Sequence, residues 1–144
     1  MSPKYMAVLA VMTFLLSGCS KEAAIALDEK DSYVLIDKKH EFLTIYAMVR
    51  NEDSQPIHNL YVDFSIRHKQ LADQLGFEQV LFDQNRRGVP SRFAVKAKSG
   101  FFISESFPLK NYERLGSLEN AVFINVYQRD EKVLESPLNN IIRN

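Results

Sequence analysis

Between Ile57 and Arg67 apolar and polar side chains alternate, and this alternation narrows the possible folds more than any other feature of the sequence. Successive side chains of a β-strand point to opposite faces, so a period of two predicts a strand with one buried and one wet face. An amphipathic helix needs apolar residues every three or four positions instead. We expect Leu60, Val62, Phe64 and Ile66 to be buried, and Asn59, Tyr61, Asp63, Ser65 and Arg67 to be comparatively exposed.

Similar short segments recur along the chain and predict its fold class. We expect strands over residues 32–38, 42–50, 57–67, 77–82, 92–98, 101–109, 121–128 and 133–136, whereas 69–76 is either one short helix or an elaborated connection. Residues 129–132 are expected to close a hairpin, and 110–120 is either a helical turn or a loop. Seven to eight strands with one or two short helical segments favour an all-β antiparallel β-sandwich, immunoglobulin-like or transthyretin-like.

Composition is compatible with one domain that has an ordinary core. The chain has 144 residues, 46% of them hydrophobic, and equal numbers of basic and acidic side chains. A net charge of zero argues against a polyanion-binding role, so we expect no nucleic acid partner. The single cysteine excludes a disulfide scaffold.

The N-terminal segment has the pattern of a targeting signal. An apolar run from Met6 to Leu16 follows Lys4. At 1.5 Å per residue such a helix is too short to cross a hydrocarbon core of about 30 Å, but it matches the apolar region of a signal peptide. We predict a signal peptide over residues 1–18, a tether over 19–31 and a β-sandwich domain over 32–144.

The end of that segment, Leu16-Ser17-Gly18-Cys19, resembles the lipobox of bacterial lipoproteins. The resemblance implies that the signal peptidase recognises Leu16, Ser17 and Gly18, that diacylglycerol is attached to the Cys19 thiol, and that the new α-amine is acylated. Two or three acyl chains would hold the protein on its bilayer. Ser20, at a position where inner-membrane lipoproteins often carry Asp, implies the outer membrane facing the periplasm. The alternative is an ordinary secretory signal with a free thiol.

The order of segments further along the chain has a second resemblance, without a specific motif. Val49-Arg50-Asn51, a loop, a long alternating strand and Lys98-Ser99-Gly100 resemble immunoglobulin-like extracytoplasmic modules. They equally resemble the sandwich lipoproteins that tether type VI secretion assemblies to the outer membrane. The resemblance implies an architecture and assigns no functional residue.

Catalytic and metal-binding motifs are not apparent in the sequence. If Ile57 to His68 is one strand, His58 and His68 lie about 33 Å apart, and His40 could meet at most one of them. The chain has no Gly-x-Ser-x-Gly, Ser-x-x-Lys or His-Glu-x-x-His motif. We therefore expect no catalytic residue, cofactor or metal, and no enzyme.

Two possible docking surfaces emerge. The stretch 84–103 contains five basic residues and no acidic one: Arg86, Arg87, Arg92, Lys96 and Lys98. Arg92, Lys96 and Lys98 would form a row on a strand, either docking an anionic partner or guarding an edge strand against aggregation. The second is an apolar outer face that would exist if the strands carrying Tyr46, Met48, Tyr61, Phe123 and Tyr127 are neighbours. The alternative is that the tether, residues 69–76 or residues 110–120 cover these side chains.

These features predict a non-enzymatic lipoprotein of the cell envelope that holds or recruits another envelope protein. The alternatives are an outer-membrane component of a type VI-like secretion apparatus, or a small-ligand-binding or hydrolytic domain on the same anchor. A deep apolar pocket with convergent polar groups would favour the ligand-binding or hydrolytic domain. A flat aromatic or basic face would favour docking.

Overall fold

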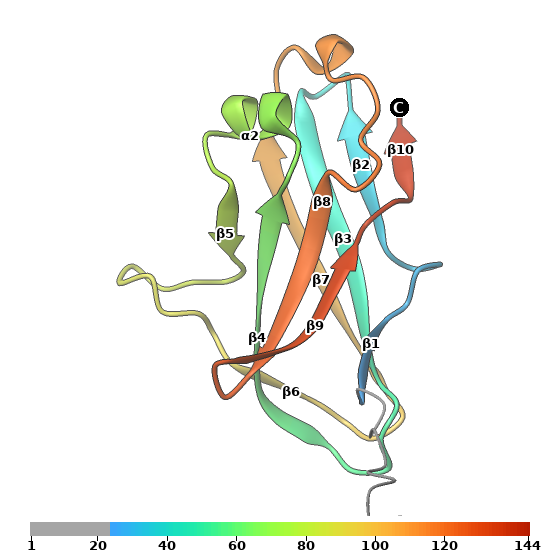
Figure 1. Cartoon of the computed structure of the whole chain (residues 1–144), viewed down its shortest axis with the longest axis vertical. Coiled ribbons are helices and arrows are strands. Elements are labelled where there is room, and N and C mark those ends of the chain that lie inside the picture. The colour runs from blue at the N-terminus through green and yellow to red at the C-terminus, as the bar shows by residue number, and fades with distance from the viewer. Residues whose placement is uncertain (1–23) are drawn as a thin grey trace, which may run out of the picture.

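Two β-sheets lie face to face in the computed structural model, which describes residues 24–144 (Figure 1). Sheet A contains β1 (Ile25–Leu27), β2 (Tyr33–Asp37), β3 (Phe42–Asn51), β7 (Gly100–Pro108) and β10 (Ile141–Arg143). Sheet B contains β4 (Ile57–Ile66), β5 (Gln79–Leu81), β6 (Phe93–Val95), β8 (Val122–Gln128) and β9 (Glu131–Pro137). The predicted all-β sandwich is confirmed.

Each sheet is organised around one ten-residue strand. In sheet A, β7 pairs along one side of β3, β1 and β2 follow one another along its other side, and β10 lies beside β2. In sheet B, β5 and β6 share one side of β4, and β8 and then β9 lie on the other. Among the described strands the β2–β10 pair is parallel and the other pairs are antiparallel.

The core fills the space between β3 and β4. Alternate side chains of both strands point inward, and those of Leu60, Val62 and Phe64 are fully buried, as the alternation predicts. Phe64 lies across from Ile124 of β8 and Val80 of β5, so its ring is enclosed by apolar side chains of three strands. The register of β4 inferred from the sequence is therefore confirmed for its buried face.

Two helical segments lie at the end of the sandwich away from β1 (Figure 1). The predicted short helix is α2 (Lys69–Leu75), and its first turn is capped by the His68 side chain, which accepts the Leu71 N–H at 3.2 Å. Gly76 ends it in the left-handed region that glycine tolerates, and its N–H donates to the Ala72 carbonyl. The ambiguous stretch 110–120 contains only a short 3-10 helix, η1 (Tyr112–Arg114).

Three boundaries differ from expectation. Residues 25–27, predicted as tether, instead form β1, because β3 extends far enough beyond β2 to pair with them. The strand predicted over 92–98 ends at Val95, since Lys98 adopts a positive φ of 52° in the turn that carries the chain from sheet B to sheet A. β10 was not predicted, because a three-residue strand is too short to show alternation.

Candidate functional site

The outer face of sheet A carries a cluster of aromatic and apolar side chains, of which Phe42 and Phe102 are exposed and the others half-buried. In β3 the odd-numbered residues are buried, so Phe42, Tyr46 and Met48 point outward, and register places Phe102 beside Met48 and Tyr33 beside Tyr46. We call these five residues the aromatic face. Phe102 is 51% exposed, so the face is accessible to a partner.

Ring contacts hold the aromatic face in one arrangement. Tyr33 stacks on Tyr46 with ring centroids 4.5 Å apart, and Tyr46 meets Phe102 at 5.9 Å. The β-ladder fixes all three backbones, and aromatic side chains lose little rotamer freedom on binding. The face is therefore a preorganised apolar surface on a rigid sheet.

The outer face of sheet B is different, although it carries the other predicted aromatic residues. Tyr61 and Tyr127 stack at 4.8 Å, the Arg92 guanidinium lies 5.0 Å from the Tyr61 ring, and Arg67 lies 3.7 Å from the Phe123 ring. These rings are already covered by each other or by cations. The hypothesis of one continuous aromatic face is wrong, because β3 and the β4–β8 pair belong to different sheets.

Two polar side chains are buried on this outer face of sheet B. Asp63 is 3% exposed and Asn125, directly opposite it on β8, is 1% exposed. The Asp63 carboxylate accepts hydrogen bonds from Asn125 Nδ2 and Gln79 Nε2, each at 2.6 Å, and from the Tyr127 hydroxyl. The expectation of an exposed Asp63 is wrong, since cross-strand neighbours cover it on a face that contributes nothing to the core.

Burial and the Asp63 carboxylate both change the pKa of Tyr127 in this cluster. Burial, followed by the hydrogen bond to Asp63 and the negative charge of that carboxylate, raises the pKa of Tyr127 to about 12. Tyr127 therefore stays a neutral donor at physiological pH. Asn125 Nδ2 donates to Asp63 and, at 2.7 Å, to Ser65, while Oδ1 is buried without a hydrogen-bond partner among the described residues.

A hollow of about 550 Å³ opens beside Asp63. Its lining is mixed, with apolar, amide and carboxylate side chains: Asp63, Phe77, Gln79, Val80, Leu81 and Gln84. Sequence reasoning missed this site, because Asp63 and Asn125 are far apart in the chain and only strand pairing brings them together. The available signal was a polar residue two positions from a tyrosine in each strand, Asp63 after Tyr61 and Asn125 before Tyr127.

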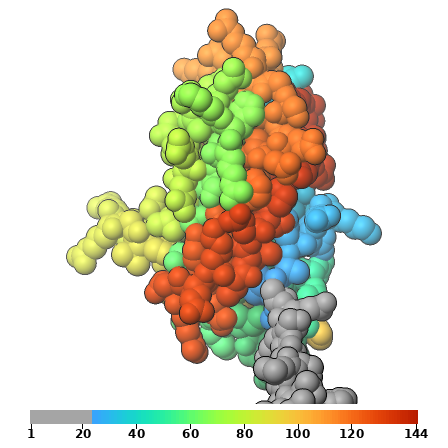
Figure 2. Space-filling view, viewed as in Figure 1, coloured from blue at the N-terminus to red at the C-terminus, as the bar shows by residue number. Residues whose placement is uncertain are grey.

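The structure separates the predicted basic residues. Arg86 and Arg87 lie in a loop that projects from the body of the molecule (Figure 2). Arg92 pairs with Asp130 at 2.9 Å, and Lys98 Nζ donates to the Glu52 carbonyl. Lys96 is exposed beyond the end of β6. Arg92, Lys96 and Lys98 therefore form no row along one strand, and that interpretation is wrong.

The projecting loop has internal order. The Asn85 side chain accepts the N–H groups of Arg87 and Val89 at 2.9 and 3.1 Å, and the backbone N–H of Asn85 donates to the Val89 carbonyl. Val89 is 52% exposed at this tip. Arg86 and Arg87 form no ion pair with residues in the described part of the chain, so they are available to an anionic surface.

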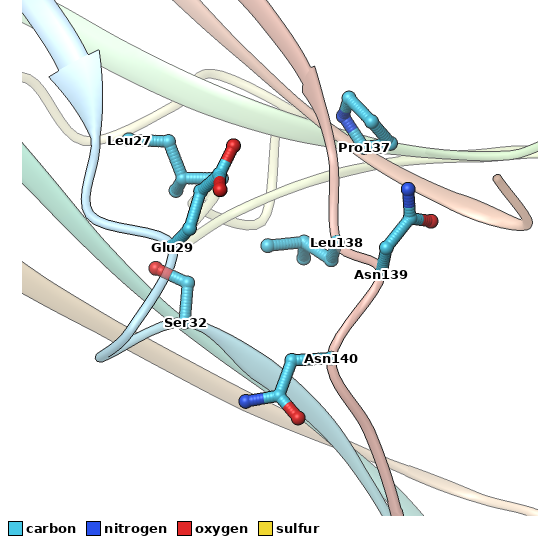
Figure 3. A pocket seen from close by; sticks show the side chains of 7 residues that line it. All are labelled: Leu27, Glu29, Ser32, Pro137, Leu138, Asn139 and Asn140. Atoms are coloured by element: carbon cyan, nitrogen blue, oxygen red, sulfur yellow. The ribbon is translucent and has the colours of Figure 1, made fainter. Parts of the chain in front are cut away.

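A second hollow, of about 340 Å³, lies where the chain passes from β9 to β10 (Figure 3). Leu138 points into it from one side, and the buried Ser32 faces it from the other. The Asn139 amide is held by hydrogen bonds with Asn120 at 2.7 and 3.1 Å. The exposed Glu29 carboxylate completes a small pocket of mixed polarity.

The open side of the sandwich between β7 and the β5–β6 edge contains an isolated carboxyl group. Two aromatic pairs bridge the sheets there, Phe93 with Phe101 at 4.1 Å and Phe77 with Phe107 at 4.9 Å. Between them on β7, burial and then the charge of Asp83 raise the pKa of Glu105, whose Oε2 lacks a hydrogen-bond partner among residues 24–144. A charge pointing inward at an edge strand opposes the addition of another strand.

Other kinds of site are not seen in the part of the chain that the structure describes. Residues 24–144 contain no group of three or more His, Cys, Asp or Glu side chains placed to hold a metal ion. No helix among them has the length and hydropathy needed to cross a membrane. The predicted signal peptide and Leu16, Ser17, Gly18 and Cys19 lie outside the described residues.

Comparisons with known proteins place the chain in no family. It matches no described protein family, and no curated protein resembles it in sequence. Among solved structures, it is similar to the ligand-binding region of serine-glutamate repeat protein A of Enterococcus faecium, with 7% identity and a TM-score of 0.45 over 83% of this chain and 96% of that one.

Two enzymes also contain similar parts. An alkylpurine DNA glycosylase of Pseudomonas fluorescens matches with 12% identity and a TM-score of 0.40, over 83% of this chain and 31% of that one. A β-glucuronidase of glycoside hydrolase family 2 matches with 11% identity and a TM-score of 0.41, over 82% of this chain and 11% of that one. Similarity this distant says nothing about function.

Proposed function

We propose that this protein is a lipid-anchored lipoprotein of the outer membrane whose periplasmic β-sandwich binds another envelope protein without catalysing a reaction. The anchor rests on the resemblance of Leu16-Ser17-Gly18-Cys19 to a lipobox after a short apolar run. Acyl chains on Cys19 would keep the domain on the periplasmic face of its membrane. A scaffold or assembly role follows, of which a type VI-like secretion component is one form.

The aromatic face is the observation that carries the docking proposal. It gathers Tyr33, Phe42, Tyr46, Met48 and Phe102 on one sheet, with Phe102 about half exposed. Aromatic residues and methionine are enriched in protein interfaces, where large rigid side chains bury much area at a small loss of entropy. A monomer whose sheet had no partner would be expected to carry polar side chains at these outward positions.

Site-specific photocrosslinking in living cells tests this proposal. A photoreactive phenylalanine analogue replaces Phe102 in one variant and Glu131, an exposed residue of β9 on the other sheet, in a control. We expect Phe102 to yield one discrete adduct with an envelope protein identified by mass spectrometry, and Glu131 to yield little of it. Equal adducts at both positions, or none at Phe102, would refute docking through the aromatic face.

A small-ligand-binding domain on the same anchor is the second candidate, supported by the hollow that contains Ser32 and Leu138 (Figure 3). Its volume is at the lower limit for small-molecule sites. Filling it by Asn140→Trp, at an exposed side chain of its lining, would abolish ligand binding in that case and would leave the Phe102 adduct unchanged. A lost adduct in a folded Asn140→Trp variant would argue against two separate sites.

A further inference from the structure

The buried Asp63 carboxylate has hydrogen-bond donors but no counterion. Its three partners are the amides of Asn125 and Gln79 and the hydroxyl of Tyr127, all neutral groups. A carboxylate removed from water is stabilised by hydrogen-bond donors and, where one lies close, by a positive charge. The protein therefore holds a nearly buried negative charge that its own described side chains do not neutralise.

The cations on the same face are already paired. Arg67 and Lys132 both bond to Glu135, at 2.7 and 2.6 Å, on the far side of Asn125 from Asp63. Arg92 pairs with Asp130 in the neighbouring hairpin. None of the ion pairs formed by residues 24–144 includes Asp63.

Further negative charge surrounds β5, the strand that borders Asp63. Glu78 precedes the strand and Asp83 follows it, and neither forms an ion pair with the described residues. The field of these carboxylates would attract a cation to this edge of sheet B. The charge pattern thus points to a positively charged ligand.

The hollow beside Asp63 has the lining that such a ligand needs. Leu81, opposite Asp63 on β5, supplies apolar surface on the same face, and the exposed Gln79 side chain bonds to the carboxylate. Lysine and arginine side chains bury an aliphatic stem against apolar surface while the charged head reaches a polar group. Rotation of Gln79 away from Asp63 would open the carboxylate to that head.

We propose that this hollow receives a lysine or arginine side chain of the partner protein, whose cationic head replaces the Gln79 amide on Asp63. The inference rests on the proposed docking function and supplies the chemistry of its partner. A cationic head adds to its hydrogen bond a Coulomb attraction to the carboxylate that the neutral Gln79 amide does not supply. The hollow is thus a specificity site on sheet B, separate from the aromatic face on sheet A.

Nuclear magnetic resonance titration of the full chain with short peptides tests the site. The probes are acetyl-Gly-Arg-Gly-amide, the lysine equivalent, and acetyl-Gly-Gln-Gly-amide as the neutral control. We expect saturable shifts of the backbone amides of residues 77–84 with the two cationic peptides and none with the glutamine peptide. Equal shifts with the neutral peptide would overturn the proposal.

Variants of two residues should change the affinity in opposite directions. Asp63→Asn removes the charge and should weaken binding of the arginine peptide at least tenfold, whereas Gln79→Ala uncovers the carboxylate and should tighten it severalfold. Asp73→Asn, an exposed carboxylate on α2 paired with Lys69, is the matched control and should change nothing. Gln79→Ala keeps the test informative if Asp63→Asn fails to fold, because Gln79 is exposed.

The possible outcomes separate this inference from the proposed function. Unchanged affinity in folded Asp63→Asn, or no tightening in Gln79→Ala, would refute the cation site even if Phe102 crosslinks a partner. An affinity for the arginine peptide that falls in Asp63→Asn and rises in Gln79→Ala would support the site. If Phe102 then gave no adduct, the proposed docking function would fail and the cation site would remain.

Discussion

Asn51, at the end of β3, is a buried residue whose side chain connects the two sheets. Its side chain is buried, and Nδ2 donates to the carbonyls of Gln55, Val95 and Lys96 at 2.8, 3.1 and 3.2 Å. Its Oδ1 accepts the Asp53 N–H at 2.8 Å. One amide therefore joins the end of a central strand in sheet A to β6 of sheet B.

The loss of stability expected for Asn51→Ala depends on which groups lose their hydrogen bond to the Asn51 side chain. Gln55 and Lys96 are exposed, so water can replace the lost bonds to their carbonyls. The carbonyl of the buried Val95 and the N–H of Asp53 lose their bond to Asn51 in a less accessible place. At about 1–3 kcal/mol for the buried Val95 carbonyl and about 1 kcal/mol for the hydrogen bond lost by the half-buried Asp53 N–H, we expect a loss of about 2–4 kcal/mol, a large fraction of the stability of a small domain.

Asn51→Asp keeps the shape of the side chain and makes the free energy of unfolding depend on pH. Burial and three facing carbonyls would raise the pKa of the new carboxyl group in the folded state above its unfolded value of about 3.9. The loss of stability caused by burying an ionised carboxylate is therefore absent below that unfolded pKa, where the group is protonated in both states. Above it the penalty grows by up to about 1.4 kcal/mol per pH unit, until the pH passes the folded pKa.

Urea denaturation followed by far-ultraviolet circular dichroism at pH 4 and pH 7 measures both variants against the natural sequence. Asn140→Asp, at an exposed asparagine, is the matched control and should lose little stability at either pH. We expect Asn51→Asp to lose clearly more stability at pH 7 than at pH 4, and Asn51→Ala to lose the same amount at both. An Asn51→Asp variant as stable at pH 7 as the natural protein would refute the reasoning.

Three further predictions concern the core, the open side and the anchor. Phe64→Ala should lose about 3–5 kcal/mol in urea denaturation, because the ring is fully buried among three strands; a loss below 1 kcal/mol would contradict this. The raised pKa of Glu105 means that its contribution to stability is full below the unfolded pKa and declines as pH rises through the folded pKa. Glu105→Gln should flatten that decline and increase stability at pH 7, and an unchanged pH profile would count against it. Cys19→Ser should accumulate as an uncut, unlipidated precursor by mass spectrometry, whereas a mature natural protein without acyl chains would exclude the lipobox interpretation.

Local periodicity was enough to predict the class of fold. The alternation from Leu60 to Ile66 predicts which side chains of β4 face the core, because a strand has only two faces and one of them must be apolar. The terminal glycine predicts the end of α2, since Gly76 adopts a positive φ. The hairpin between β8 and β9 was also predicted, and its turn is tighter than expected, with Arg129 and Asp130 both at positive φ.

The candidate sites depended on strand order, which local pattern does not contain. The sequence by itself determined that Asp63 lies on the outward side of its strand, and only tertiary structure decided that it is buried, because Asn125, Gln79 and Tyr127 reach it from other strands and bond to it. Likewise the sequence determined that Tyr46 and Tyr61 point away from the core. Only the assignment of their strands to different sheets decided that Tyr46 joins Phe102 on an exposed face while Tyr61 is covered by Tyr127 and Arg92. The physical reason is that outward direction is a local property of backbone geometry, whereas exposure depends on which distant side chains become neighbours.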